Sequence, residues 1–110
     1  MGLLVEGTDY EVMGVQVGTV FNEVVIRTIN TVDDGDTLVV DLSDYGISDT
    51  GLIGVEGWEH TTDNSIVVQA NPTTVVASGE LTLTVSGSND NNPRHYLVKG
   101  HAKPNPTSAL

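Results

Sequence analysis

The chain has 110 residues, a length typical of one domain with a single hydrophobic core. It contains no cysteine, which excludes disulfides, thiolate metal sites and cysteine nucleophiles. The 15 acids against 4 lysines and arginines give a net charge of −11, so nucleic acid and anionic membranes would be repelled.

Neither a membrane span nor a secretion signal is predicted. The chain has no run of about 18 apolar residues, which a spanning helix would need. Residues 1–6 lack the basic region and the long apolar core of a secretion signal. We therefore expect neither a membrane nor nucleic acid among the partners.

Alternating apolar and polar residues predict β-strands along most of the chain. Residues 1–9 carry no sustained period and indicate an N-terminal arm. The strand at residues 19–29 has apolar side chains on both faces, so either a partner covers the second face or a bulge shifts the register. Residues 102–110 hold two prolines and no period, which predicts a tail. The expected strands span residues 10–17, 19–29, 36–42, 52–59, 65–70, 80–86 and 94–101.

Residues 33–47 carry the clearest local signals. Asp34 followed by Gly35 predicts a turn, because glycine adopts positive φ at little cost. A strand with one buried face follows, and Gly46 then predicts a second turn. Residues 47–51 are expected to form a loop. The inward side chains of the strand are predicted to be Leu38, Val40 and Leu42.

The overall pattern predicts an all-β fold. No segment has helical periodicity, and good helix formers are sparse. Roughly seven short strands separated by turn signals are typical of a single-domain antiparallel β-sandwich. The pattern leaves a jelly-roll order and an immunoglobulin-like order open. We expect the sandwich to span residues 10–101, between the arm of residues 1–9 and the tail of residues 102–110.

No catalytic, metal-binding or cofactor-binding pattern is present. The acids around Gly35 do not match the spacing of a calcium-binding loop. His95 and His101 lie about 20 Å apart along one predicted strand, too far for a single zinc ion to bridge. The chain has neither a nucleophile-elbow motif nor a phosphate-binding glycine loop. We therefore expect no enzymatic activity, no cofactor, no metal and no small-molecule substrate.

Charge is unevenly distributed along the chain. All 15 acids lie at or before Asp90, whereas most of the cations follow it. This arrangement is either chance in a short segment or a cationic end that docks an acidic partner surface. The residues concerned are Arg94, Lys99 and Lys103, with His95 and His101 between them.

Two aromatic residues are candidates for the ends of the core or for partner contacts. Tyr45 combines a large apolar ring with a polar tip, which suits the closing of one end of a small core. Trp58, the only tryptophan, is expected to fill the core at a strand end. The alternative is an exposed contact residue, of the kind that anchors interfaces.

Three segments share strand and turn motifs with a known class of protein. Residues 33–47 begin with a D-x-G-D-T strand start, and residues 81–91 lead into a loop of glycine, serine, asparagine and aspartate. The segment Arg94-His95-Tyr96-Leu97-Val98-Lys99-Gly100 follows an R-x-Y-x-V-x-G pattern. Together they resemble small all-β structural proteins of tailed bacteriophages that decorate, or cement, the capsid. The resemblance covers about residues 20–101.

The resemblance implies a virion protein, made in the host cytoplasm, that sits on the outer capsid surface. Its partner would be the major capsid protein, and it would act as a homotrimer around local threefold points. Because an extended arm can add a strand to a neighbouring sheet, we expect partner contacts in residues 1–9 and at strand-end aromatics. The candidate contact residues are Leu3, Leu4, Val5, Tyr45 and Trp58.

Three alternatives stay open at the level of the sequence. A module that binds carbohydrate or a host surface would use the loops at residues 60–64 and 87–93. A tail or baseplate structural component would form rings or filaments. An enzyme would need a buried carboxylate with a strongly raised pKa in a cleft, and only the acid-rich composition favours it.

Overall fold

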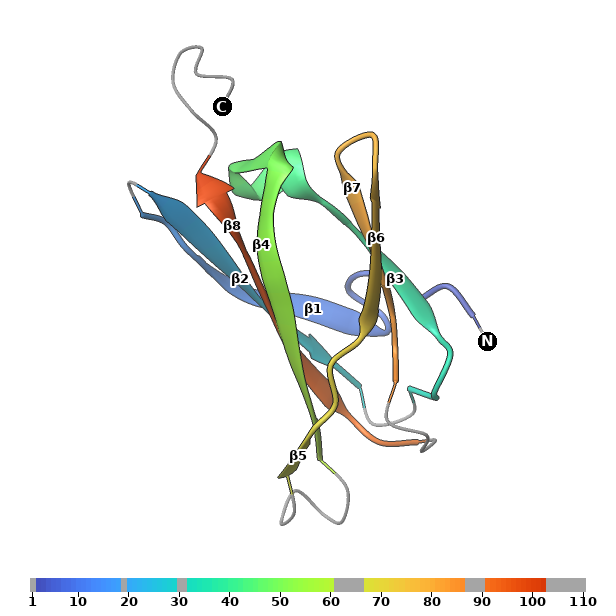
Figure 1. Cartoon of the computed structure of the whole chain (residues 1–110). Coiled ribbons are helices and arrows are strands. Elements are labelled where there is room, and N and C mark those ends of the chain that lie inside the picture. Colours follow the sequence, from blue (N-terminus) through green and yellow to red (C-terminus); the bar gives the residue numbers. More distant parts are fainter. Residues whose placement is uncertain (1, 19, 30–31, 61–66, 87–90, 103–110) are drawn as a thin grey trace.

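A computed structural model describes residues 2–18, 20–29, 32–60, 67–86 and 91–102. These residues form strands and one short 3-10 helix, η1, and no α-helix occurs among them (Figure 1). In chain order the elements are β1 (Tyr10–Gln16), β2 (Phe21–Thr28), β3 (Thr37–Asp41), η1 (Leu42–Tyr45), β4 (Ile47–His60), β5 (Val67–Gln69), β6 (Thr73–Ala77), β7 (Glu80–Thr84) and β8 (Arg94–Ala102).

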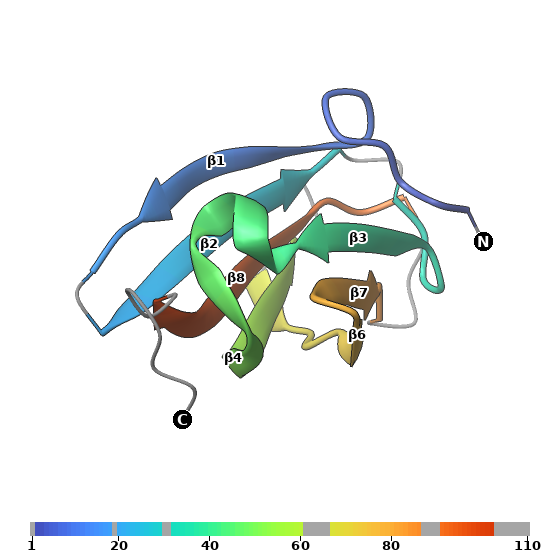
Figure 2. The ribbon, with the colours of Figure 1, turned by 90° about the horizontal axis from the view of Figure 1, so that it is seen from above.

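The strands form two antiparallel sheets that face each other, so the predicted all-β sandwich is confirmed (Figures 1 and 2). The larger sheet has the order β1-β2-β8-β4-β5, and the smaller sheet has the order β3-β7-β6. β8 pairs with β2 on one side and with β4 on the other. The larger sheet is therefore complete only when β8, the last strand of the described residues, is in place.

The hydrophobic core lies between the sheets and follows the predicted alternation. In β7, Leu81 and Leu83 are fully buried, whereas Thr82 and Thr84 lie on the opposite side of the strand. Burying one such leucine side chain contributes about 2 kcal/mol. The most deeply buried core residues are Val24, Ile26, Val32, Leu38, Val40, Leu42, Ile47, Leu81, Leu83, Val85, Tyr96 and Val98.

The turn predicted after β3 is the helix η1, which is capped by local side chains. The Asp41 carboxylate accepts hydrogen bonds from the Ser43 backbone N–H at 3.1 Å and from the Ser43 hydroxyl at 2.8 Å. Gly46 ends the helix with φ of 72°, a conformation that residues with a Cβ rarely adopt. The Asn22 amide of β2 donates to the Tyr45 carbonyl at 2.9 Å, which ties this turn to the larger sheet.

Two predictions about the middle of the chain are wrong. The sequence predicts a loop at residues 47–51, but β4 begins at Ile47, which is completely buried. Register shifts between Ile47 and Leu52 and between Leu52 and Gly54 interrupt the alternation, and this is why the pattern hides the strand. The sequence also predicts no strand at residues 73–77, yet they form β6 at the edge of the smaller sheet. All side chains of β6 are exposed, so no alternation marks it.

The N-terminal arm lies along the chain's own smaller sheet. Leu3 forms a parallel bridge with Thr37. The Leu4 N–H donates to the Thr37 carbonyl at 2.7 Å, and the Thr37 N–H donates to the Gly2 carbonyl at 2.9 Å. The arm thus pairs with the first residue of β3 at the free edge of that strand. At the other end, Ala102 belongs to β8, and the rest of the predicted tail lies outside the described residues.

Candidate interaction surfaces

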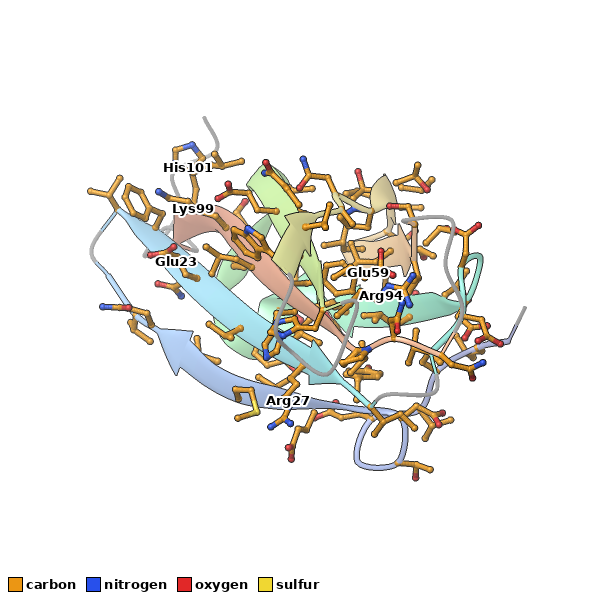
Figure 3. The ribbon with its side chains drawn as sticks, turned by 90° about the horizontal axis from the view of Figure 1, so that it is seen from below. Glu23, Arg27, Glu59, Arg94, Lys99 and His101 are labelled. Atoms are coloured by element: carbon orange, nitrogen blue, oxygen red, sulfur yellow. The ribbon has the colours of Figure 1, made fainter. Side chains whose placement is uncertain are left out.

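Arg94, which the sequence places in a cationic end, is buried inside the sandwich (Figure 3). Its guanidinium lies 3.6 Å from the Glu59 carboxylate, and it donates to the carbonyl oxygens of Val32, Asn92 and Ser86 at 2.8, 2.8 and 3.1 Å. The Asn92 amide donates to the same Glu59 carboxylate at 2.8 Å. This network joins β4, β8 and two connections at one end of the sandwich. Arg94 therefore stabilises the interior, and the prediction that it faces a partner is wrong.

The side of the larger sheet that points away from the core carries a distinctive set of residues. The chain has four lysines and arginines, of which Arg94 is buried and Lys103 lies outside the described residues. The other two, Arg27 and Lys99, are on this surface (Figure 3). All three histidines lie there as well. We call this surface the outer face, and its residues are Glu11, Phe21, Glu23, Val25, Arg27, Gly54, Glu56, Trp58, His60, His95, Leu97, Lys99 and His101.

Strand pairing arranges the centre of the outer face in three rows across β2, β8 and β4. Neighbours within a row lie about 5 Å apart, and successive rows on one face lie about 7 Å apart. The middle row is the most apolar. The row on one side of it contains Arg27, and the row on the other side contains Lys99. The rows are Arg27–His95–Trp58, Val25–Leu97–Glu56 and Glu23–Lys99–Gly54.

Charge on the outer face is nearly balanced, unlike the charge of the chain as a whole. Its acids are Glu11, Glu23 and Glu56, against the cations Arg27 and Lys99, whereas the whole chain carries −11. Arg27 is exposed on this face, whereas Lys99 is half-buried. The Arg27 guanidinium is therefore accessible to a partner, and the Lys99 ammonium is partly accessible.

Aromatic and imidazole rings add to the outer face. The Lys99 ammonium lies 4.1 Å from the ring centre of Phe21, a cation–π contact. The rings of His60 and His95 have centres 4.6 Å apart and planes tilted by 41°. Burial lowers the pKa of His95 below its ordinary value of 6.5, and the neighbouring His60 and Arg27 lower the pKa further. His95 is thus mainly neutral at neutral pH.

The outer face also has a recess at the β1–β2 end. A cavity of about 500 Å³ opens beside His95, and its lining includes Tyr10, Glu11 and Arg27. Among the described residues, no group of three or more histidines, cysteines or acids is placed to hold a metal ion. The buried carboxylate of Glu59 does not line this cavity. The arrangement is that of a contact surface with a recess beside His95.

The edge strand β6 is a second candidate surface. It is the last strand of the smaller sheet, and all of its side chains are exposed, with Val75 exposed to 66%. Charged side chains and proline usually protect an edge strand from pairing with other chains, and β6 has neither. At the opposite edge of the same sheet, the N-terminal arm pairs with Thr37 at the start of β3. An extended segment of a partner can therefore add to this sheet at β6.

The structure does not bring the five predicted contact residues together. Leu3 and Val5 are exposed on the arm, whereas Leu4 packs against the core. Tyr45 lies in η1 and packs against the core at its edge, and burial raises the pKa of its hydroxyl. Trp58 is half-buried and lies on the outer face rather than in the core, so the core-filling interpretation is wrong. Its alternative, a partner contact, stays a prediction.

Sequence reasoning missed the outer face as a unit. The apolar second face of residues 19–29 was a signal for it, because Val25 is exposed although it lies in a central region of the sheet. The missing information was the strand order that places Arg27 beside His95 and His95 beside Trp58. Most of the loops proposed for carbohydrate binding, at residues 61–64 and 87–90, lie outside the described residues.

Comparisons of this chain with protein families, with curated proteins and with solved structures find no match. No helix in the described part of the chain has the length and apolar character needed to cross a membrane.

Proposed function

We propose that this protein is a structural virion protein that binds the outer surface of a bacteriophage capsid and stabilises it. The observation that carries the proposal is the open edge of β6, which is uncharged, exposed along its whole length and rich in β-branched residues. Such an edge accepts an extended segment of a neighbouring protein through backbone hydrogen bonds. On a capsid, many copies act together, so one modest contact per copy adds up to a stable shell.

The rest of the molecule suits this role. The buried pair of Arg94 and Glu59 and the well-filled core make a rigid body that loses little conformational entropy on docking. The strong net negative charge keeps the free protein soluble and limits non-specific contacts. The resemblance of residues 33–47 and 94–100 to capsid-decorating proteins supports the same role.

Co-sedimentation with expanded, empty capsids of the major capsid protein from the same genome tests the proposal. Val75 and Val39 are exposed valines that flank Thr82 in one row of the smaller sheet, so they form a matched pair. Val75→Lys places a charge on the open edge and is expected to reduce capsid occupancy. Val39→Lys places the same charge on β3 at the opposite edge of the sheet, where the arm already pairs with Thr37 and the Val39 carbonyl accepts a hydrogen bond from the Tyr10 hydroxyl. It is expected to leave occupancy unchanged.

Two results would contradict the proposal. Equal occupancy for the wild type and both lysine variants would show that β6 is not the docking edge. No capsid binding by the wild type, together with binding to a glycan array, would favour the carbohydrate-binding alternative.

A further inference from the structure

We propose that the outer face is a two-fold interface through which two copies of this chain pair. This goes beyond capsid binding, which rests on β6 and needs no pairing of free copies. Within the described residues, no helix or strand covers the outer face, although its middle row contains Val25 and Leu97. Val25 is 38% exposed and lies on β2, which has a hydrogen-bonded strand on each side.

Charge favours a second copy as the occupant. Two molecules that each carry −11 repel one another through most of their surfaces. The outer face is the part of the described surface where cations and acids are nearly balanced. Because salt screens charges beyond about 8 Å at physiological ionic strength, the charges in the contact itself decide whether two copies can approach.

The order of the three rows makes the outer face complementary to itself. A two-fold axis along the middle row, Val25–Leu97, lays β2 of one copy over β2 of the other and reverses its direction. The rows on either side are then exchanged. Arg27 of each copy lies opposite Glu23 of the other, so the pairing forms two equivalent contacts between opposite charges.

The same operation matches large residues with small ones on β4. Trp58 of one copy lies opposite Gly54 of the other, since these residues occupy the two outer rows. A Cβ built on Gly54 would meet no atom within 4 Å, so the space above this glycine is open. Tryptophans that become packed and lose their water in an interface carry much of its binding energy.

Two other pairs complete the arrangement. Neutral His95 faces Lys99 of the second copy and can accept a hydrogen bond from its ammonium group. Glu56 meets its own counterpart near the axis, which opposes pairing. Glu56 is exposed, so water and salt weaken this repulsion.

Size-exclusion chromatography with light scattering, at physiological salt and over a range of protein concentrations, tests the pairing. The wild type is expected to reach a mass of twice the 11.6 kDa chain. Glu23→Arg places the new arginine of each copy opposite Arg27 of the other copy, so like charges meet at two symmetric positions. We expect it to weaken the dimer on the order of a hundredfold or more. Glu80→Arg on β7 is the matched control, because it changes the net charge by the same two units on the opposite sheet, and it should leave the dimer unchanged.

The charge swap gives the decisive comparison. Arg27→Glu alone should also break the dimer, whereas the double variant Glu23→Arg/Arg27→Glu restores opposite charges across the axis and should recover it. Circular dichroism checks that all variants fold, as expected for substitutions at the sheet surface. A wild type that stays a monomer at the highest soluble concentration would overturn the inference. So would a mass of three chains, which the capsid resemblance implies, or a swap that fails to restore pairing.

Discussion

Replacing Glu59 with glutamine is predicted to destabilise the fold strongly, because it removes a carboxylate charge from the interior. The Arg94 guanidinium lies 3.6 Å away, and the two side chains are 0% and 2% exposed. Two unit charges at this distance attract by about 5 kcal/mol at an effective dielectric constant near 20. Breaking a buried pair by removing one partner costs about 3–5 kcal/mol. Glutamine can still accept the hydrogen bond from Asn92, so we expect the lower value, about 3 kcal/mol.

Arg94→Met is expected to cost more than Glu59→Gln. It removes the charge opposite Glu59 and also the donors to the carbonyl oxygens of Val32, Asn92 and Ser86. A buried acceptor that loses its donor costs about 1–3 kcal/mol. The double variant should lose less stability than the sum of the two single variants, because the charge–charge attraction can be lost only once.

Equilibrium unfolding in urea, followed by circular dichroism, measures these free energies. Glu80 is an exposed glutamate on β7, and Glu80→Gln is the control. It should change the free energy of unfolding by no more than about 0.5 kcal/mol. A domain of this size is stable by about 5–15 kcal/mol, so Glu59→Gln should also lower the melting temperature by about 10 °C or more. If Glu59→Gln costs no more than Glu80→Gln, the buried pair does not stabilise the fold as predicted.

Three further predictions concern single residues. The Tyr96 hydroxyl is buried without a hydrogen-bond partner in the described part of the chain, and burial raises its pKa. Tyr96→Phe should therefore leave stability unchanged or raise it by about 1 kcal/mol in urea unfolding, and a loss would contradict this. A Cβ on Gly57 would lie 2.5 Å from the Ala70 carbonyl oxygen, so Gly57→Ala should cost about 2 kcal/mol, whereas Gly54→Ala should be nearly neutral in the same assay. Because its pKa is lowered in the folded state, His95 resists protonation there, and stability should fall as the pH drops below about 6.5. The stability of His95→Gln should fall less than that of the wild type between neutral pH and about pH 5, and an equal fall would contradict the prediction.

Local sequence determined most of the strands and the identity of the core. In β3 and β7, alternation with a period of two named the buried residues, including Leu38, Val40, Leu81 and Leu83. This works because a strand places successive side chains on opposite faces wherever one face is covered. The turn at Gly46 was also readable, since positive φ favours glycine.

Only the tertiary structure decided the roles of the charged and aromatic residues. Glu59 and Arg94 lie far apart in the sequence and become direct neighbours through the pairing of β4 with β8, so no local pattern could show that Arg94 is buried. The position of Trp58 could not be predicted either. Alternation shows which residues share a face with Trp58, but it does not show whether that face is buried or exposed. Strand order and the position of the opposing sheet settle which face is covered. The outer face and the open edge of β6 are therefore properties of the assembled sandwich, whereas most of its strands can be predicted from the alternation of apolar and polar residues.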